Sequence, residues 1–302
     1  MPLIQITGLK KSFQGIEVIK GLDFTLEKGK CIALLGPNGA GKTTTLRMLS
    51  GLMNPTSGRI NFTKSKKNED IRDLIGYLPQ FPVFYEWMSG LEFLVYVGKL
   101  AGLTGKEAKE RSLELLQLVG ILDAKNRKVG KYSGGMKQRL GIAQALIHRP
   151  QLIMLDEPVS ALDPIGRREV LDLLEGLKKE TTILFSTHIL SDAEEVCDKI
   201  LFLHNGEIVE SGTMAELRER HQQAKIDLYF RGKAEDYSSI FTSDELTQSL
   251  RNEGNRVSIF VENIALARQS FLKRISEQNL PLEKFEISSM TLEDVFMKVV
   301  GK

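Results

Sequence analysis

The segment GPNGAGKT at residues 36–43 constrains the fold of this chain more than any other part of its sequence. It follows the apolar run CIALL and opens an apolar stretch with helical spacing, so it predicts a loop between a buried strand and a helix. Glycines let such a loop turn its backbone N–H groups around phosphate oxygens, and the helix N-terminus adds positive potential there. Lys42 would reach the β- and γ-phosphates of a nucleotide, and the Thr43 hydroxyl would ligate Mg²⁺. The predicted phosphate contacts are Gly36, Pro37, Asn38, Gly39, Ala40, Gly41, Lys42, Thr43 and Thr44.

Two adjacent acids follow the apolar run LIML in the segment LIMLDEP, residues 152–158. Asp156 would stand at the tip of a buried strand, where a carboxylate can hold Mg²⁺ directly or through water. Glu157 would point into the same site and could polarise an attacking water. Taken alone, adjacent acids after a strand could equally cap a helix, but beside a phosphate loop the catalytic interpretation is favoured.

The order of the apolar patterns predicts an α/β fold. Short runs rich in branched aliphatic residues at 31–36, 152–157 and 181–187 are typical of strands buried on both faces of a parallel sheet. Stretches with helical spacing separate them, and the N-terminal segments LIQIT, VIKGLDFTLEKG and SGRINF favour antiparallel strands joined by turns.

From about Lys225 the pattern changes. Two segments alternate apolar and polar residues, which is typical of strands with one buried face, and a closing helix would begin at Thr291. We therefore predict a nucleotide-binding domain at 1–224 and a small α+β domain at 225–302. The apolar stripe of the closing helix would be Leu292, Val295, Phe296 and Val299.

Composition narrows the possible functions. In 302 residues the chain carries 41 basic and 39 acidic side chains, a net charge of +2 that does not favour binding to nucleic acid. No apolar stretch approaches the roughly 20 residues of a membrane-spanning helix, so membrane work would require a separate partner. The first residues do not resemble a signal peptide, and two cysteines cannot form a disulfide framework. A cytoplasmic location is predicted.

Four further motifs, together with the phosphate loop, form a pattern that is typical of one protein family. YSGGMKQR at 132–139 precedes LIMLDEP, Gln80 ends YLPQ, SALD occupies 160–163, and His188 follows the strand-like TTILFST. In motif order and over residues 1 to about 220, the chain resembles the nucleotide-binding subunits of ATP-binding cassette (ABC) transporters. The family's signature motif usually has Leu and Gln where this chain has Tyr132 and Met136.

The resemblance implies the P-loop ABC cassette fold, with an antiparallel β subdomain and an α-helical subdomain, and roles for single residues. Gln80 would sense Mg²⁺ or the lytic water, and His188 would contact the γ-phosphate and orient Glu157. Phe13 would stack on adenine, although packing in the core is an alternative. Asp163 would belong to the D-loop.

Ser133, Gly134 and Gly135 would cover the γ-phosphate bound by a partner cassette. Physical reasoning supports this anion site, because a hydroxyl, free amides and a helix N-terminus converge there. The alternative is that this segment only caps a helix.

The predicted function is the ATPase subunit of an ABC transporter. Two copies, or one copy and a related cassette, would close on two ATP–Mg²⁺ and drive a separate membrane permease, with the chain peripheral on the inner face of the membrane. The tail SSMTLEDVF at 288–296 resembles that of ABC-2-type exporters of antibiotics, drugs or sodium. The alternative is a soluble ABC ATPase with a regulatory, ribosome-associated or DNA-associated role, in which no permease would take part.

Overall fold

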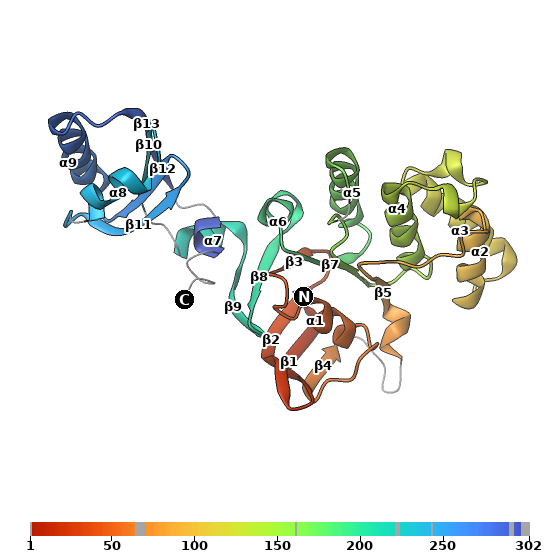
Figure 1. Ribbon diagram of the computed structural model, residues 1–302. Coiled ribbons are helices and arrows are strands. Elements are labelled where there is room, and N and C mark those ends of the chain that lie inside the picture. The colour runs from red at the N-terminus through yellow and green to blue at the C-terminus, as the bar shows by residue number, and fades with distance from the viewer. Residues whose placement is uncertain are drawn as a thin grey trace. The chain divides into compact units, whose positions relative to one another are not determined.

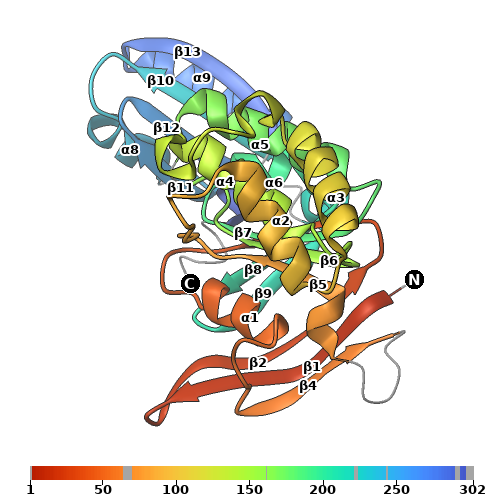
Figure 2. The ribbon, with the colours of Figure 1, turned by 90° about the vertical axis from the view of Figure 1, so that its right-hand side faces the viewer.

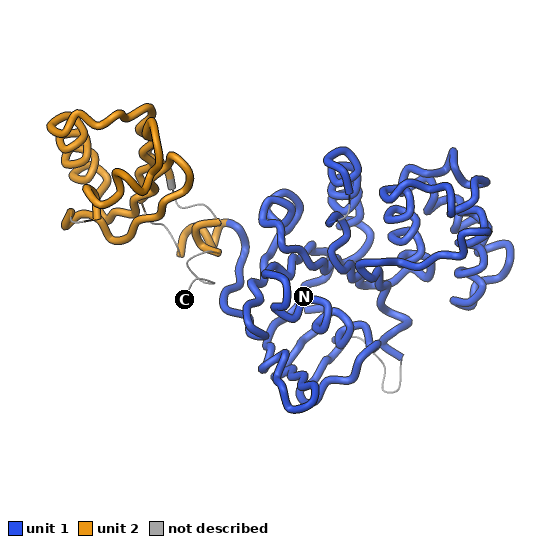
Figure 3. The backbone as a smooth tube through the Cα atoms, viewed as in Figure 1, with its two compact units in different colours: residues 1–214 blue, residues 215–302 orange. Residues whose placement is uncertain are grey.

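The computed structural model describes residues 2–63, 70–160, 162–220, 224–242, 244–289 and 293–296. The chain forms two compact units, Met1–Met214 and Ala215–Lys302 (Figure 3). The units therefore meet about ten residues before the boundary predicted at 224/225, and helix α7 (Met214–Arg220) lies between the two positions. Within the described ranges, no helix is both long enough and apolar enough to cross a membrane.

The first unit is built on a six-stranded sheet with the order β5-β6-β7-β3-β8-β9 (Figure 1). Its strands are β3 (Cys31–Leu35), β5 (Ile75–Leu78), β6 (Leu152–Asp156), β7 (Thr182–Thr187), β8 (Lys199–His204) and β9 (Glu207–Gly212). Neighbours run parallel except for β9, which pairs antiparallel with β8. Strands β3, β6 and β7 are buried along their whole length because apolar layers cover both faces of the sheet. They confirm the three predicted buried runs.

Different layers cover the two faces of this sheet. Helices α5 (Pro164–Leu177) and α6 (Leu190–Val196) lie on one face, and α1 (Lys42–Leu49) lies on the other with a second sheet (Figures 1 and 2). That antiparallel sheet has the order β2-β1-β4. Its strands are β1 (Pro2–Phe13), β2 (Ile16–Glu27) and β4 (Ser57–Phe62). Side chains of both sheets and of α1 share one hydrophobic core.

A group of helices lies beyond the β5 edge of the central sheet (Figure 1). It contains α2 (Gly90–Leu100), α3 (Gly105–Leu118) and α4 (Gly134–Ala145), with short 3₁₀ helices η2 (Leu122–Ala124) and η3 (Val129–Lys131). A further 3₁₀ helix, η1 (Ile71–Leu74), leads into β5. Capping boxes start α2 at Ser89 and α3 at Thr104, in each case with a glutamate three residues later.

The second unit contains a four-stranded antiparallel sheet with the order β11-β12-β10-β13. Its elements are β10 (Ala224–Phe230), α8 (Glu235–Thr242), β11 (Thr247–Glu253), β12 (Arg256–Val261), α9 (Ile264–Glu277) and β13 (Leu282–Ser289). Alternate residues of β10 and β12 form a core with apolar side chains of α8 and α9. Together the two units confirm the predicted fold class, an α/β cassette followed by a small α+β unit.

Residues 293–296 contact the sheet of their own unit. Residues 293–296 are helical and Val295 is buried. Asp294 pairs with Lys225 on β10, at 3.0 Å, and with Arg251 on β11, at 3.4 Å. Thr291, Leu292 and Val299, which we assigned to a closing helix, lie outside the described residues.

Candidate nucleotide-binding site

The site lies where the strands of the central sheet end, because β3, β5, β6 and β7 are parallel and their carboxyl ends point the same way. The carboxyl ends of β3, β5, β6 and β7 meet there, as ligand sites of open α/β sheets do. The phosphate loop follows β3, Gln80 follows β5, Glu157 follows β6, and His188 follows β7. Motifs that are far apart in the sequence therefore converge.

Tight packing shapes the phosphate loop. A Cβ on Gly36 would stand 2.2 Å from the carbonyl oxygen of Leu203 on β8, so only glycine fits at this first position. The Gly36 N–H also donates to the Thr187 carbonyl at 3.2 Å. Gly41, the N-cap of α1, adopts a φ of 106°, in the region that favours glycine.

A cavity of about 430 Å³ opens over this loop. Its lining residues are Val18, Asn38, Gly39, Gly41, Lys42, Thr43, Thr44, Gln80 and Glu157. Eight of these nine were predicted from the sequence, and Val18 was not, because no motif marks it. Gly36, Pro37 and Ala40 belong to the loop without lining the cavity, and Phe13 does not line it either.

Lys42 is a buried cation, with its side chain 5% exposed. Its ammonium group donates to the carbonyl oxygens of Gly36, at 2.8 Å, and Pro37, at 3.1 Å. It also lies 3.3 Å from Oε1 of Glu157. A buried charge needs such partners, and together they hold the ammonium at the mouth of the phosphate loop.

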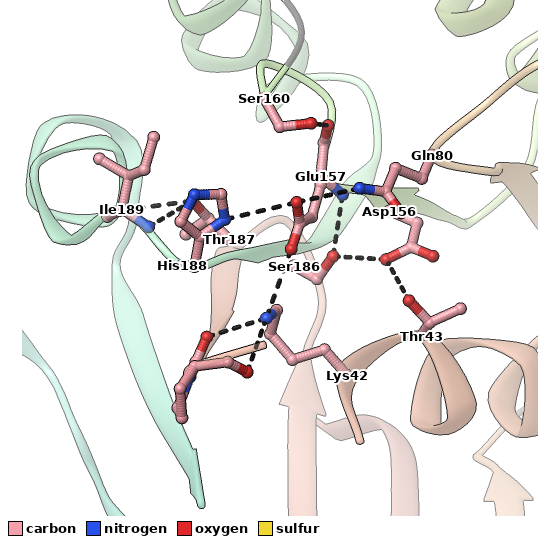
Figure 4. Close-up of polar contacts among 12 residues, drawn as sticks. Lys42, Thr43, Gln80, Asp156, Glu157, Ser160, Ser186, Thr187, His188 and Ile189 are labelled. Carbon is pink, nitrogen blue, oxygen red and sulfur yellow. Dashed lines mark hydrogen bonds and ion pairs between the residues drawn. The ribbon is translucent and has the colours of Figure 1, made fainter. Parts of the chain in front are cut away.

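The Asp156 carboxylate is buried at the end of β6. Its Oδ1 accepts hydrogen bonds from the hydroxyls of Thr43, at 3.1 Å, and Ser186, at 2.7 Å (Figure 4). Burial raises the pKa of the Tyr77 phenol on β5, and the Asp156 charge raises it further, so this neighbour stays neutral at physiological pH. Ser186 was not predicted from the sequence.

Carboxylate and hydroxyl oxygens are suitable ligands for Mg²⁺, and Thr43 and Asp156 place them beside each other. Among the residues that the structure describes, no group of three or more His, Cys, Asp or Glu side chains could hold a metal ion. Mg²⁺ usually keeps several waters and is bound by one or two carboxylates together with phosphate oxygens of its substrate.

Glu157 joins the other predicted catalytic side chains (Figure 4). Its Oε2 accepts a hydrogen bond from the Gln80 amide at 3.2 Å and lies 3.3 Å from Nδ1 of His188. Its Oε1 faces Lys42. The backbone of Glu157 has a φ of 47°, a left-handed conformation that is uncommon for a residue with a side chain and often marks functional sites.

The turn that carries His188 is anchored by buried polar groups. The Thr187 hydroxyl accepts from the Ile189 N–H at 3.0 Å and lies 3.3 Å from Oδ2 of Asp192. Asp192 pairs in turn with Arg167 on α5. Burial raises the pKa of the Asp192 carboxyl, and the Arg167 charge opposes this shift.

The predicted signature residues do not line the cavity of their own chain. Ser133 is the exposed N-cap of α4, and its hydroxyl accepts from the Met136 N–H at 3.2 Å. Gly134 and Gly135 follow, with open space where a Cβ would lie. Tyr132, where the family usually has Leu, is buried and donates to the Ala124 carbonyl at 2.8 Å.

Two further predicted contacts lie outside the cavity. Asp163 is the exposed N-cap of α5, and its Oδ1 accepts from the Gly166 N–H at 2.7 Å. Phe13 is 43% exposed at the end of β1, with the Lys11 ammonium 5.0 Å from its ring centroid. Packing of Phe13 in the core, the alternative from the sequence, is not what the structure shows.

Comparisons with known proteins place both units in one family. A family model described as "ABC transporter" matches residues 19–160, and one described as "ATP-binding protein DrrA1-3-like, C-terminal domain" matches 212–300. The ABC transporter ATP-binding protein YxlF of Bacillus subtilis is 44% identical over 99% of both chains. The bacitracin transport ATP-binding protein BcrA of Bacillus licheniformis is 36% identical, over 99% of this chain and 97% of BcrA.

A solved structure shows the same cassette. It is described as a dimeric post-hydrolysis state of an ATP-binding cassette bound to ADP and Pi, and is 26% identical to this chain. The TM-score is 0.63, over 70% of this chain and 98% of that one. From its cassette, its C-terminal unit and relatives that match along its whole length, we conclude that the chain belongs to the family of ABC transporter ATP-binding subunits, which bind and hydrolyse ATP.

Proposed function

We propose that this chain is the ATPase subunit of an ABC exporter, pairing with a second cassette and driving a separate membrane permease. The observation that carries the proposal is the position of Glu157 beside the nucleotide cavity, in contact with Lys42, Gln80 and His188. Such an arrangement serves phosphoryl transfer to water, because it sets a base and a fixed cation around one reacting centre.

In this mechanism Lys42 and the loop amides bind the β- and γ-phosphates of ATP. Thr43 and Asp156 would hold Mg²⁺, which neutralises phosphate charge when bound. Water attacks the γ-phosphorus, the bond to the ADP oxygen breaks, and the proton of the water passes to the Glu157 carboxylate. Gln80 and His188 fix the orientation of that carboxylate, and Lys42 stabilises charge on the transferring group.

A second cassette is proposed because the signature segment is exposed. Ser133 and Gly134 present a hydroxyl and a helix N-terminus to solvent, outside the cavity of their own chain. These groups suit the γ-phosphate bound by a partner. The dimeric state described for the solved cassette supports the same pairing.

The permease would dock on exposed apolar side chains that follow Gln80. Phe81 is 74% exposed, Val83 90% and Trp87 68%. Tyr85 contacts both Trp87 and Tyr96 of α2, with ring centroids 6.0 and 5.9 Å apart, so the rings form one cluster. Exposed apolar side chains of this kind mark binding surfaces, and the segment that carries most of them begins directly after Gln80, which contacts Glu157.

Export of an antibiotic-like compound is the proposed direction and cargo class. BcrA is named for bacitracin transport, and the C-terminal unit matches a DrrA-like domain. A relative in Streptomyces peucetius is named for daunorubicin and doxorubicin resistance. The chain would then lie at the inner face of the membrane, attached through its permease.

Co-purification from detergent-solubilised membranes tests the proposal. We expect a protein with several membrane spans to accompany the wild-type chain and to be lost from Trp87→Ser. Leu52→Ser is the matched control, because Leu52 is 63% exposed outside the aromatic cluster. Absence of a membrane partner for the wild type, or its retention by Trp87→Ser, would contradict the proposal, and the first result would favour a soluble role.

A further inference from the structure

Ser186 is a buried polar residue at the nucleotide site, and no role was predicted for it from the sequence. It belongs to β7, between buried apolar residues and the turn that carries His188. It is fully buried, and parallel pairing sets it opposite Asp156 of β6. A buried hydroxyl is costly without hydrogen-bond partners, so its contacts show what it does.

One hydroxyl serves both adjacent acids (Figure 4). The Ser186 Oγ–H donates to Oδ1 of Asp156 at 2.7 Å. The same oxygen accepts the backbone N–H of Glu157 at 2.9 Å. Ser186 therefore uses its donor toward the carboxylate of one acid and its acceptor toward the main chain of the next.

The contact to Glu157 bears on an unfavourable backbone conformation. A φ of 47° persists in a non-glycine residue only where the surroundings hold it. The Ser186 hydroxyl oxygen accepts a hydrogen bond from the Glu157 N–H, and the Ser160 hydroxyl donates one to the Glu157 carbonyl oxygen at 3.1 Å. This conformation directs the Glu157 side chain toward Lys42 and His188 rather than along the line of β6.

The contact to Asp156 decides which carboxylate oxygen stays available. Oδ1 accepts both Ser186 and Thr43. Oδ2 receives no hydrogen bond from any residue in the described part of the chain. The carboxylate is thereby fixed with one oxygen directed to the protein and the other free for a metal ion or its water.

We propose that Ser186 is a positioning residue for ATP hydrolysis, acting through Asp156 and Glu157 at once. The proposal rests on the roles proposed above for these two acids. Removing the hydroxyl should release the Asp156 carboxylate and relax the backbone of Glu157, while the phosphate loop keeps its own contacts. The loss should therefore appear in kcat more than in the KM for ATP.

Steady-state hydrolysis by a set of matched variants tests this role. We expect Ser186→Ala to lower kcat about tenfold or more, because hydrogen bonds to charged groups are strong, and to change KM less than about threefold. Ser186→Thr keeps the hydroxyl and should restore most of the rate. Ser112→Ala removes another fully buried hydroxyl, which donates to the Ala108 carbonyl at 2.6 Å within α3, and should stay within about twofold of the wild type.

A double-mutant cycle with Glu157→Gln separates positioning from general damage. Because part of the Ser186 effect runs through Glu157, adding Ser186→Ala to Glu157→Gln should lower the residual rate by a clearly smaller factor than Ser186→Ala lowers the wild-type rate. An equal loss in both backgrounds, or a Ser186→Ala enzyme as fast as the wild type, overturns the inference while the proposed function stands. Wild-type activity of Glu157→Gln would instead refute the proposed function, and with it the need for a positioning residue.

Discussion

Alanine at Gly36 and at Gly39 should damage the phosphate loop in different ways. At Gly36 an added Cβ would stand 2.2 Å from the Leu203 carbonyl oxygen, about 1 Å closer than an ordinary contact between carbon and oxygen. Two buried backbone segments must separate to relieve this overlap, which should cost about 3 kcal/mol of stability. Gly39 has nothing within 4 Å of its Cβ position and a φ of 83°, so only backbone strain of about 1–2 kcal/mol is expected.

Native-state hydrogen exchange at the amides of β3 and β8 measures this difference, since it reports the free energy of opening for that part of the cassette. Gly176→Ala is the control: Gly176 lies in α5 with open space at its Cβ position, so this variant should be unchanged or slightly more stable. Gly39 lines the cavity, so Gly39→Ala should also weaken ATP binding. Equal losses of stability at Gly36 and Gly39, or none at Gly36, would refute the packing argument.

Three further predictions concern pairing, the C-terminal unit and its separability. Mixing Lys42→Ala chains with Ser133→Ala chains should partly restore ATPase activity, because one composite site in each mixed dimer is intact; no recovery despite demonstrated mixing would argue against action in trans. Asp294→Ala should lower the stability of the C-terminal unit by about 1–3 kcal/mol in thermal unfolding, because the buried Lys225 loses one of its two carboxylate partners and keeps Asp227, and ATP affinity should not change. An unaltered melting transition would contradict that assignment. A chain ending at Arg220 should fold and bind ATP like the full chain but dimerise or couple to the permease less well; lost ATP affinity in a folded short chain would contradict modularity.

The parts of the site that could be predicted are those encoded by short segments. The phosphate loop could be predicted because one continuous segment contains its strand, its glycines and the first turn of its helix. Glu157 and His188 were predictable because each directly follows a buried apolar run. The carboxyl ends of parallel strands lie on the same side of the sheet, so the α/β pattern predicts that these side chains converge.

Other parts depend on pairing between distant strands. Ser186 becomes a site residue only because β6 and β7 pair in the register that sets it opposite Asp156, and sequence spacing does not specify register. Val18 reaches the cavity because β2 passes beside the phosphate loop, where a Cβ on Gly41 would stand 3.5 Å from the Val18 carbonyl oxygen. The adenine contact of Phe13 rested on resemblance alone, and the cavity lining does not include it.

Single-turnover and steady-state ATP hydrolysis by Glu157→Gln tests most directly the claim that Glu157 activates the attacking water. The substitution keeps the size of the side chain and its contact with Gln80, but the amide cannot take the proton. We expect ATP affinity to persist, hydrolysis to fall by about 10²-fold or more, and an ATP-dependent dimer to accumulate. Glu110→Gln, at an exposed glutamate on α3, should hydrolyse ATP like the wild type. Hydrolysis by Glu157→Gln at the wild-type rate would show that the catalytic base lies elsewhere.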